Sequence, residues 1–165
     1  MYSDAVSETL SRVPIVDGWF TDDIHAPTLI GSRCALCGTY VFPPRSGDCP
    51  NPRCDSTTLD PTPLSRRGRI WSYTENCYAP PPPYVAADPY EPYALAAVEL
   101  ADEGLVVLGR VVTGIRAADL KVGMEMQLEL DVSHRDAEHE YMVYVWAPAT
   151  STLPATPATT PGAHS

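Results

Sequence analysis

Alternation of apolar and polar residues dominates the second half of the chain. Residues 124–132 carry an apolar side chain at every second position, which is typical of a strand with one buried face. Other runs rich in β-branched and aromatic residues also favour strands, and Gly104 lies where two of them meet in a tight turn. Strands are predicted at residues 68–78, 93–100, 105–112, 124–132 and 139–146.

A brief helical turn is predicted around Ala117, Ala118 and Leu120, between the third and fourth of these strands. Five strands with a short helix at this point match an OB-type barrel. Closing the sheet would hide strand edges that otherwise aggregate. The almost continuous apolar run at 105–112 predicts a central strand.

The first twelve residues carry a helical pattern instead. Val6 and Leu10 recur at helical spacing, and Pro14 would end the helix. Trp19 and Phe20 follow outside any strand pattern. They either pack on the core of their own domain or anchor a partner protein, and the sequence leaves both interpretations open.

Four cysteines form two close pairs. Two residues separate Cys34 from Cys37, and four separate Cys49 from Cys54. Thiolate ligands of zinc come in such pairs, each on a tight turn, and Gly38 stands where such a turn often needs a positive φ. The four cysteines therefore predict a zinc site, and a site closed by four thiolates is structural rather than catalytic.

Two other interpretations of the cysteines remain open. Iron in a rubredoxin-like site would carry electrons, and two disulfides would need an oxidising compartment.

Around the second cysteine pair, residues 40–45 predict a ribbon strand that ends in a proline turn, and residues 55–63 predict a polar connector to the second module. The predicted fold class is mainly β: an N-terminal helical segment, a rubredoxin-like zinc ribbon and a five-stranded OB-fold barrel.

The charge balance limits the partners that we expect. The net charge is −10, with 21 acidic and 11 basic residues, whereas affinity for nucleic acid comes largely from basic charge. The sequence contains no apolar run of about 20 residues, and its first twenty residues lack the apolar centre of a signal peptide. We therefore expect a cytoplasmic protein without a nucleic-acid or membrane partner.

Four consecutive prolines at 80–83 interrupt the barrel pattern between its first two strands. Such a run forces a polyproline II conformation. The segment is either a stiff connector or a docking strip and wall of a ligand groove. The predicted organisation is an N-terminal arm at 1–30, a zinc ribbon at 31–63, an OB-fold at 64–148 and a disordered tail at 149–165.

Several short motifs occur in a specific order. They are Cys-x-x-Cys-Gly at 34–38, Phe-Pro-Pro-Arg at 42–45, Cys-Pro at 49–50, Arg-Gly-Arg-Ile-Trp-Ser-Tyr-Thr at 67–74 and Lys-Val-Gly-Met at 121–124. The combination resembles acyl-CoA-associated proteins that join an N-terminal zinc ribbon to an OB-fold, and the likeness covers roughly residues 31–148.

The resemblance implies a small partner subunit. Members of that family accompany thiolases that cleave aromatic acyl-CoA esters, aldolases of steroid side-chain degradation and some acetyltransferases, and the catalytic residues lie largely on the thiolase-like partner. We therefore expect a hetero-oligomer without an active site of its own in this chain. Acyl-CoA is an expected ligand, and its phosphates would meet Arg45, Arg66, Arg67 and Arg69.

No residue of this chain is predicted to be catalytic. Cys77 is the only thiol outside the two pairs, and we expect it to be buried and inert. No histidine lies near a serine or cysteine in a recognisable catalytic arrangement. An alternative function is binding of single-stranded nucleic acid by the barrel, with Trp71 and Tyr73 as stacking residues.

Overall fold

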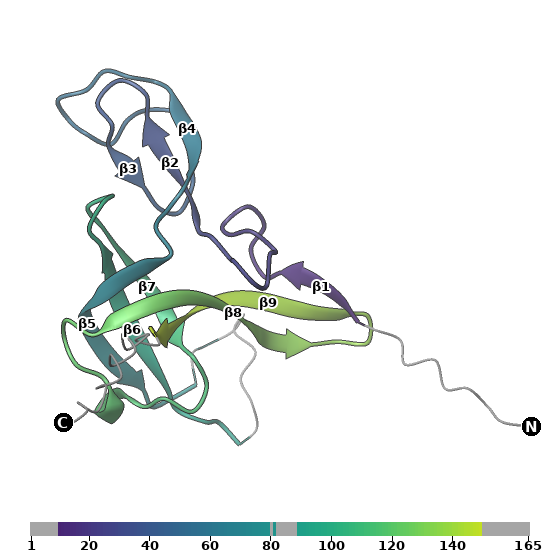
Figure 1. Cartoon of the computed structure of the whole chain (residues 1–165). Helices are drawn as coiled ribbons and strands as arrows, with labels where there is room; N and C mark the ends of the chain where they lie inside the picture. Colours follow the sequence, from purple (N-terminus) through teal and green to yellow (C-terminus); the bar gives the residue numbers. More distant parts are fainter. Residues whose placement is uncertain (1–9, 80, 82–88, 150–165) are drawn as a thin grey trace, which may run out of the picture.

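Two β-sheets form the part of the chain that the computed structural model describes, residues 10–79, 81 and 89–149. A three-stranded sheet stands above a six-stranded one (Figure 1). The elements are β1 (Ser11–Pro14), β2 (Ile30–Cys34), β3 (Tyr40–Val41), β4 (Leu59–Pro63), β5 (Arg67–Asn76), β6 (Tyr93–Leu100), β7 (Leu105–Val111), the 3₁₀-helix η1 (Ala117–Asp119), β8 (Glu125–Arg135) and β9 (His139–Pro148).

Strands β5 to β9 close into the predicted barrel. β5 pairs with β6 and β6 with β7, both antiparallel, and β7 then pairs with β9 in parallel. β9 pairs with β8, and β8 returns to β5. The five-stranded closed sheet and the helical turn between β7 and β8 are therefore confirmed.

The barrel core is built around Trp146, whose side chain is fully buried. The neighbouring strand β7 pairs with β9 here, and its Gly109 lets the ring approach the backbone: a Cβ at this position would lie 2.9 Å from the indole. Small residues on β6, Ala94 and Ala96, are also buried and leave room for large side chains from β8, such as Met126. Alternation of large and small residues thus fills the narrow interior.

The apolar run at 105–112 forms β7, which lies between β6 and β9 in the sheet, so the prediction of a central strand is confirmed. In β7, buried residues alternate with exposed ones, and the side chains of Val106 and Leu108 are 48% and 60% exposed. A closed barrel has an outer face along every strand, so these apolar side chains point to solvent.

The predicted N-terminal helix is wrong where the structure describes it. Residues 1–9 lie outside the described part, but Ser11 and Arg12 belong to β1, which runs parallel to β9 from Ser11 opposite His139 to Pro14 opposite Met142. The edge of β9 offers unpaired backbone groups here. Pairing with this edge overrides the weak helical preference of the sequence.

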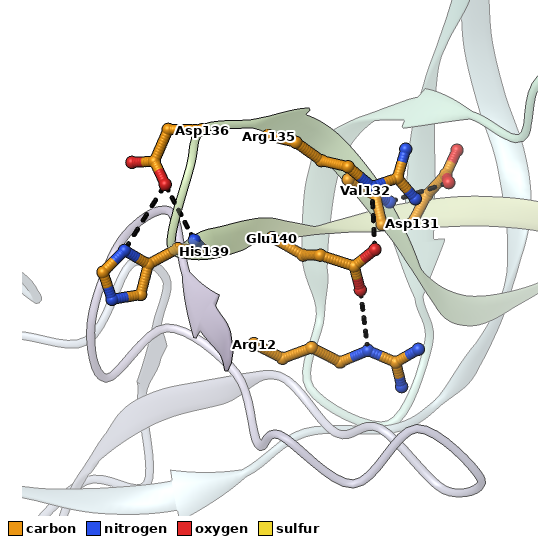
Figure 2. Close-up of polar contacts among 7 residues, drawn as sticks. All are labelled: Arg12, Asp131, Val132, Arg135, Asp136, His139 and Glu140. Atoms are coloured by element: carbon orange, nitrogen blue, oxygen red, sulfur yellow. Dashed lines mark hydrogen bonds and ion pairs between the residues drawn. The ribbon is translucent and has the colours of Figure 1, made fainter. Parts of the chain in front are cut away.

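Carboxylates fix the outer end of the β8–β9 hairpin against β1 (Figure 2). Glu140 lies between two arginines and accepts from Arg12 Nε at 3.0 Å and from Arg135 Nε at 2.7 Å. The hydrogen bond from Arg135, and then that from Arg12, lower the pKa of Glu140. At the turn, Asp136 accepts the backbone N–H groups of Glu138 and His139 and the hydroxyl of Tyr141, which lowers its pKa from 3.8 to about 2.

The Asp136 carboxylate predicts acid sensitivity of this hairpin. Because its pKa is lower in the folded than in the unfolded chain, its stabilising effect is complete above pH 3.8 and is lost as the pH falls towards about 2. We expect the urea midpoint of the wild-type chain to fall across this window. Asp136→Asn should show a smaller fall, because the amide stays neutral throughout.

The matched control for this prediction is Asp102→Asn, which removes an exposed carboxylate from the turn between β6 and β7. It should reproduce the acid dependence of the wild-type chain. An Asp136→Asn curve that is identical to the wild-type curve between pH 4 and pH 2 would refute the assignment.

The upper sheet has the order β3-β2-β4, with β2 in the centre. Two details differ from the expected ribbon. The strand predicted at 40–45 ends at Val41, because Pro43 and Pro44 cannot donate to a ladder. The connector predicted at 55–63 contains β4, an edge strand in which prolines are tolerated.

An aromatic cluster joins the upper sheet to the barrel. Phe42 lies after β3, and its ring centroid is 5.7 Å from that of Trp19 and 6.0 Å from that of Tyr144 on β9. Phe20 is buried and lies 6.1 Å from the Tyr144 ring. Both Trp19 and Phe20 therefore pack on the chain's own core, which decides between the two interpretations left by the sequence.

No helix in the described residues is long and apolar enough to cross a membrane.

Candidate metal centre

The first cysteine pair lies on a tight turn at the end of β2. The backbone N–H of Gly38 donates to the carbonyl of Cys34, and the N–H of Cys34 donates to the carbonyl of Thr39, each at 2.9 Å. Gly38 has the predicted positive φ, 76°, which a residue with a Cβ adopts only at a cost. The turn presents the sulfurs of Cys34 and Cys37 on one side.

The second cysteine pair lies on a longer turn before β4. The N–H of Cys54 donates to the carbonyl of Asn51, and the Asn51 side chain accepts from the N–H of Arg53 at 3.0 Å. An asparagine that bonds its own backbone two residues later stabilises such a turn. The backbone N–H of Cys49 donates a hydrogen bond of 2.9 Å to the carbonyl of Ser56, which closes the loop.

The four sulfurs of these turns converge. Cys34 Sγ lies 3.8 Å from Cys54 Sγ, and Cys37 Sγ lies 3.5 Å from Cys49 Sγ, with all four sulfurs within 4.8 Å of one another. A tetrahedral zinc with bonds of about 2.3 Å requires sulfur–sulfur edges of about 3.8 Å. A disulfide would need about 2.05 Å. The four cysteines thus form a group that can hold one metal ion, and their spacing fits a tetrahedral thiolate site.

The thiols differ in how readily they ionise. Hydrogen bonds from the hydroxyl and the backbone N–H of Thr39 lower the pKa of Cys37 to about 6. At Cys54 the backbone N–H of Ser56 acts to lower the pKa, but burial and the other three cysteines outweigh it and raise the pKa to about 12. Four thiolates at this spacing repel one another, so full ionisation requires a cation among them. Thr39 is a contributor that sequence reasoning missed; its position directly after Gly38 was the available signal.

The four arginines predicted to meet CoA phosphates do not lie together. Arg45 stabilises the ribbon: its backbone exchanges hydrogen bonds with the Ser32 hydroxyl at 2.8 and 2.9 Å, and its side chain donates to the carbonyl of Asp48. Arg66 Nε donates to the carbonyl of Pro27 at 2.7 Å. Both side chains therefore hold backbone segments of the chain itself.

Arg67 and Arg69 do lie side by side on β5. They line a cavity of about 300 Å³ together with Glu99, Asp102 and Glu125. Arg69 forms an ion pair of 3.0 Å with Glu125. Two of the four predicted arginines therefore share a surface, but acidic side chains line it as well.

Cys77 and two aromatic residues of β5 all lie at the surface of the barrel. Cys77 is exposed, not buried as expected, because it follows the last residue of β5 where the chain leaves the barrel. Trp71 and Tyr73 are 62% and 37% exposed on β5, so both rings are accessible.

The fold and the cysteine geometry agree with comparisons to known proteins. The model of the ChsH2 rubredoxin-like zinc ribbon domain matches residues 26–60, and that of the ChsH2 C-terminal OB-fold domain matches residues 61–131. A DUF35 domain-containing scaffold protein of Methanocaldococcus jannaschii is 30% identical over 116 residues, which cover 70% of this chain and 77% of that protein. The chain belongs to the ChsH2 zinc-ribbon and OB-fold family.

Two other similar proteins are named as parts of enzymes. This ChsH2-type chain is 43% identical over 54 residues to the benzoylsuccinyl-CoA thiolase subunit BbsA of Thauera aromatica, a match that spans 33% of this chain and 35% of that protein. Among solved structures, a chain of an Ltp2-ChsH2(DUF35) aldolase superposes with a TM-score of 0.55 at 30% identity, covering 74% of this chain and 85% of that chain.

Proposed function

We propose that this chain is a non-catalytic subunit that binds and supports a thiolase-like or aldolase enzyme acting on acyl-CoA thioesters, in cleavage or formation of a carbon–carbon bond. The observation that carries the proposal is the likeness to a chain of an aldolase assembly over 85% of that chain's length. The name of BbsA, a thiolase subunit for benzoylsuccinyl-CoA, supports a thioester as the substrate of the assembly.

In this proposal Cys34, Cys37, Cys49 and Cys54 hold one zinc ion. The convergence of the four sulfurs supports this ligand set. A bound zinc ion would cross-link the two cysteine turns. It would have no open coordination position for a substrate, because four thiolates complete its tetrahedral shell. The ribbon is then a rigid support, and the bond-making residues belong to the partner.

The proposal also includes a contact with the thioester ligand. Arg67 is exposed and forms no ion pair among the described residues, and it lines the same cavity as Arg69. A guanidinium presented in this way suits phosphate oxygens. We therefore place the CoA contact at Arg67 and Arg69 and give Arg45 and Arg66 a structural role.

Co-expression with a thiolase-like protein encoded beside this chain tests the proposed function. The two proteins should elute together from a size-exclusion column, at a mass larger than that of either alone. A tagged version of each should retain the other through the column. Separate elution, together with no change in the solubility or turnover of the enzyme, would contradict the proposal.

A further inference from the structure

A second cavity lies on the barrel, away from the cysteines and from Arg67 and Arg69. It has a volume of about 520 Å³, within the range of small-molecule sites. Its walls come from the residues around the start of β6, the end of β7, the loop that leads to η1, and Ser133 of β8. OB-folds bind ligands on the face formed by the strands that correspond to β6 and β7.

Three charged residues line this cavity, Glu91, Arg110 and Arg116, and Arg110 on β7 differs from the other two in having a buried polar atom that lacks a partner. Its Nε is buried and has no hydrogen-bond partner among residues 10–79, 81 and 89–149, and no acidic side chain in these ranges forms an ion pair with it. A buried polar atom without a partner is rare and requires an explanation, such as a bound ion. Arg116, the other arginine of the cavity, is instead paired with Glu75.

Aromatic packing, not an ion pair, positions the Arg110 side chain. Its guanidinium lies over the Tyr93 ring, 4.5 Å from the centroid. Tyr93 packs edge-on against Tyr90, whose hydroxyl exchanges hydrogen bonds of 2.9 and 3.0 Å with Asn76 of β5. The guanidinium is therefore held in place by aromatic packing and forms no ion pair among the described residues, which favours binding of an anion.

We propose that the cavity beside Arg110 binds the oxyanion group of a small molecule, a phosphate or a carboxylate, with the tyrosines as the wall against the rest of the ligand. The hydroxyl of Ser133 lies in the lining and is a further donor for the oxyanion, whereas the hydroxyl of Thr113 already donates to Asp131 at 3.3 Å. This site goes beyond the proposed function, because it requires no partner protein and uses none of the residues assigned above.

Titration of the isolated full-length chain with phenyl phosphate, benzoate and acetyl-CoA tests the site, with chloride at equal ionic strength as the reference. Saturable shifts are expected in the ¹H–¹⁵N spectrum at the Arg110 side-chain N–H and at the amides of Thr113 and Gly114. Phenyl phosphate alone would assign a phosphate, benzoate alone a carboxylate, and competition by acetyl-CoA a thioester ligand. Shifts with none of the three, or the same shifts with chloride, would overturn the proposal.

Variants separate a specific site from general attraction. Arg110→Gln should weaken the binding about tenfold or more, because a charge-assisted hydrogen bond is lost. Arg53→Gln, which removes an exposed arginine of the ribbon, should bind as the wild-type chain does. Equal losses of affinity in the two variants would overturn the proposed site.

The side-chain N–H signal of Arg110 in the wild-type chain still reports binding if Arg110→Gln does not fold. Co-elution with the thiolase-like partner should survive in Arg110→Gln, so the two proposals fail separately.

Discussion

Cys54→Ser, or removal of the metal with a chelator, should unfold the ribbon and leave the barrel folded. The upper sheet has little core of its own, and β3 has only two residues. Structural zinc contributes about 10–16 kcal/mol to the folding of small zinc modules at neutral pH. We expect zinc affinity to fall by about 100-fold or more in Cys54→Ser.

The measurement combines metal analysis with an amide spectrum. The wild-type chain should contain one zinc per chain, and the variant should lose both the zinc and the dispersed signals of residues 30–63. The buried indole of Trp146 should report an intact barrel. Cys77→Ser is the control, since Cys77 lies outside the cysteine group and should retain the metal. A Cys54→Ser chain with full zinc and an unchanged ribbon would contradict the ligand set.

Trp146→Ala should destabilise the barrel by about 3–5 kcal/mol, the usual cost of truncating a large buried aromatic residue. The side chain is fully buried and packs against the backbone at Gly109, so its removal leaves a cavity that the rigid sheet cannot fill. A domain of this size is stable by about 5–15 kcal/mol. The variant should therefore be close to unfolding.

Urea unfolding followed by circular dichroism measures this effect, and Trp71→Ala provides a control with the same chemical change. The Trp71 side chain is 62% exposed, and its loss should change the free energy of unfolding by about 0.5 kcal/mol or less. Similar midpoints for the two variants would show that Trp146 does not have the central role assigned to it.

The barrel was predictable from sequence because two local signals agree. Alternation along residues 124–132 and the turn at Gly104 both specify antiparallel strands, and the structure places β8 and the β6–β7 hairpin there. The cysteine group was predictable for a similar reason, since close pairs of ligands need only a local turn. Gly38 shows this directly, with its φ of 76°.

The errors arise where distant residues decide the structure. Ser11 and Arg12 form a strand because β9, more than a hundred residues later, presents a free edge. The segment that contains β4 looks like a loop because of its prolines, yet the edge of β2 accepts it. The contacts of the arginines also depend on distant residues: Arg66 Nε donates to the carbonyl of Pro27, and Arg69 forms an ion pair with Glu125. The sequence alone does not indicate the position of Arg110 over the Tyr93 ring, because strand pairing between β6 and β7 brings the two residues together.

Reconstitution with the neighbouring thiolase-like enzyme tests the central claim most directly, by turnover of an acyl-CoA thioester. This chain alone should show no activity. The pair should exceed the enzyme alone, and substitution of Arg67 and Arg69 by glutamine should raise KM for the thioester more than it lowers kcat. Activity of the isolated chain, or an enzyme whose rate and affinity do not change when the chain is added, would contradict the account.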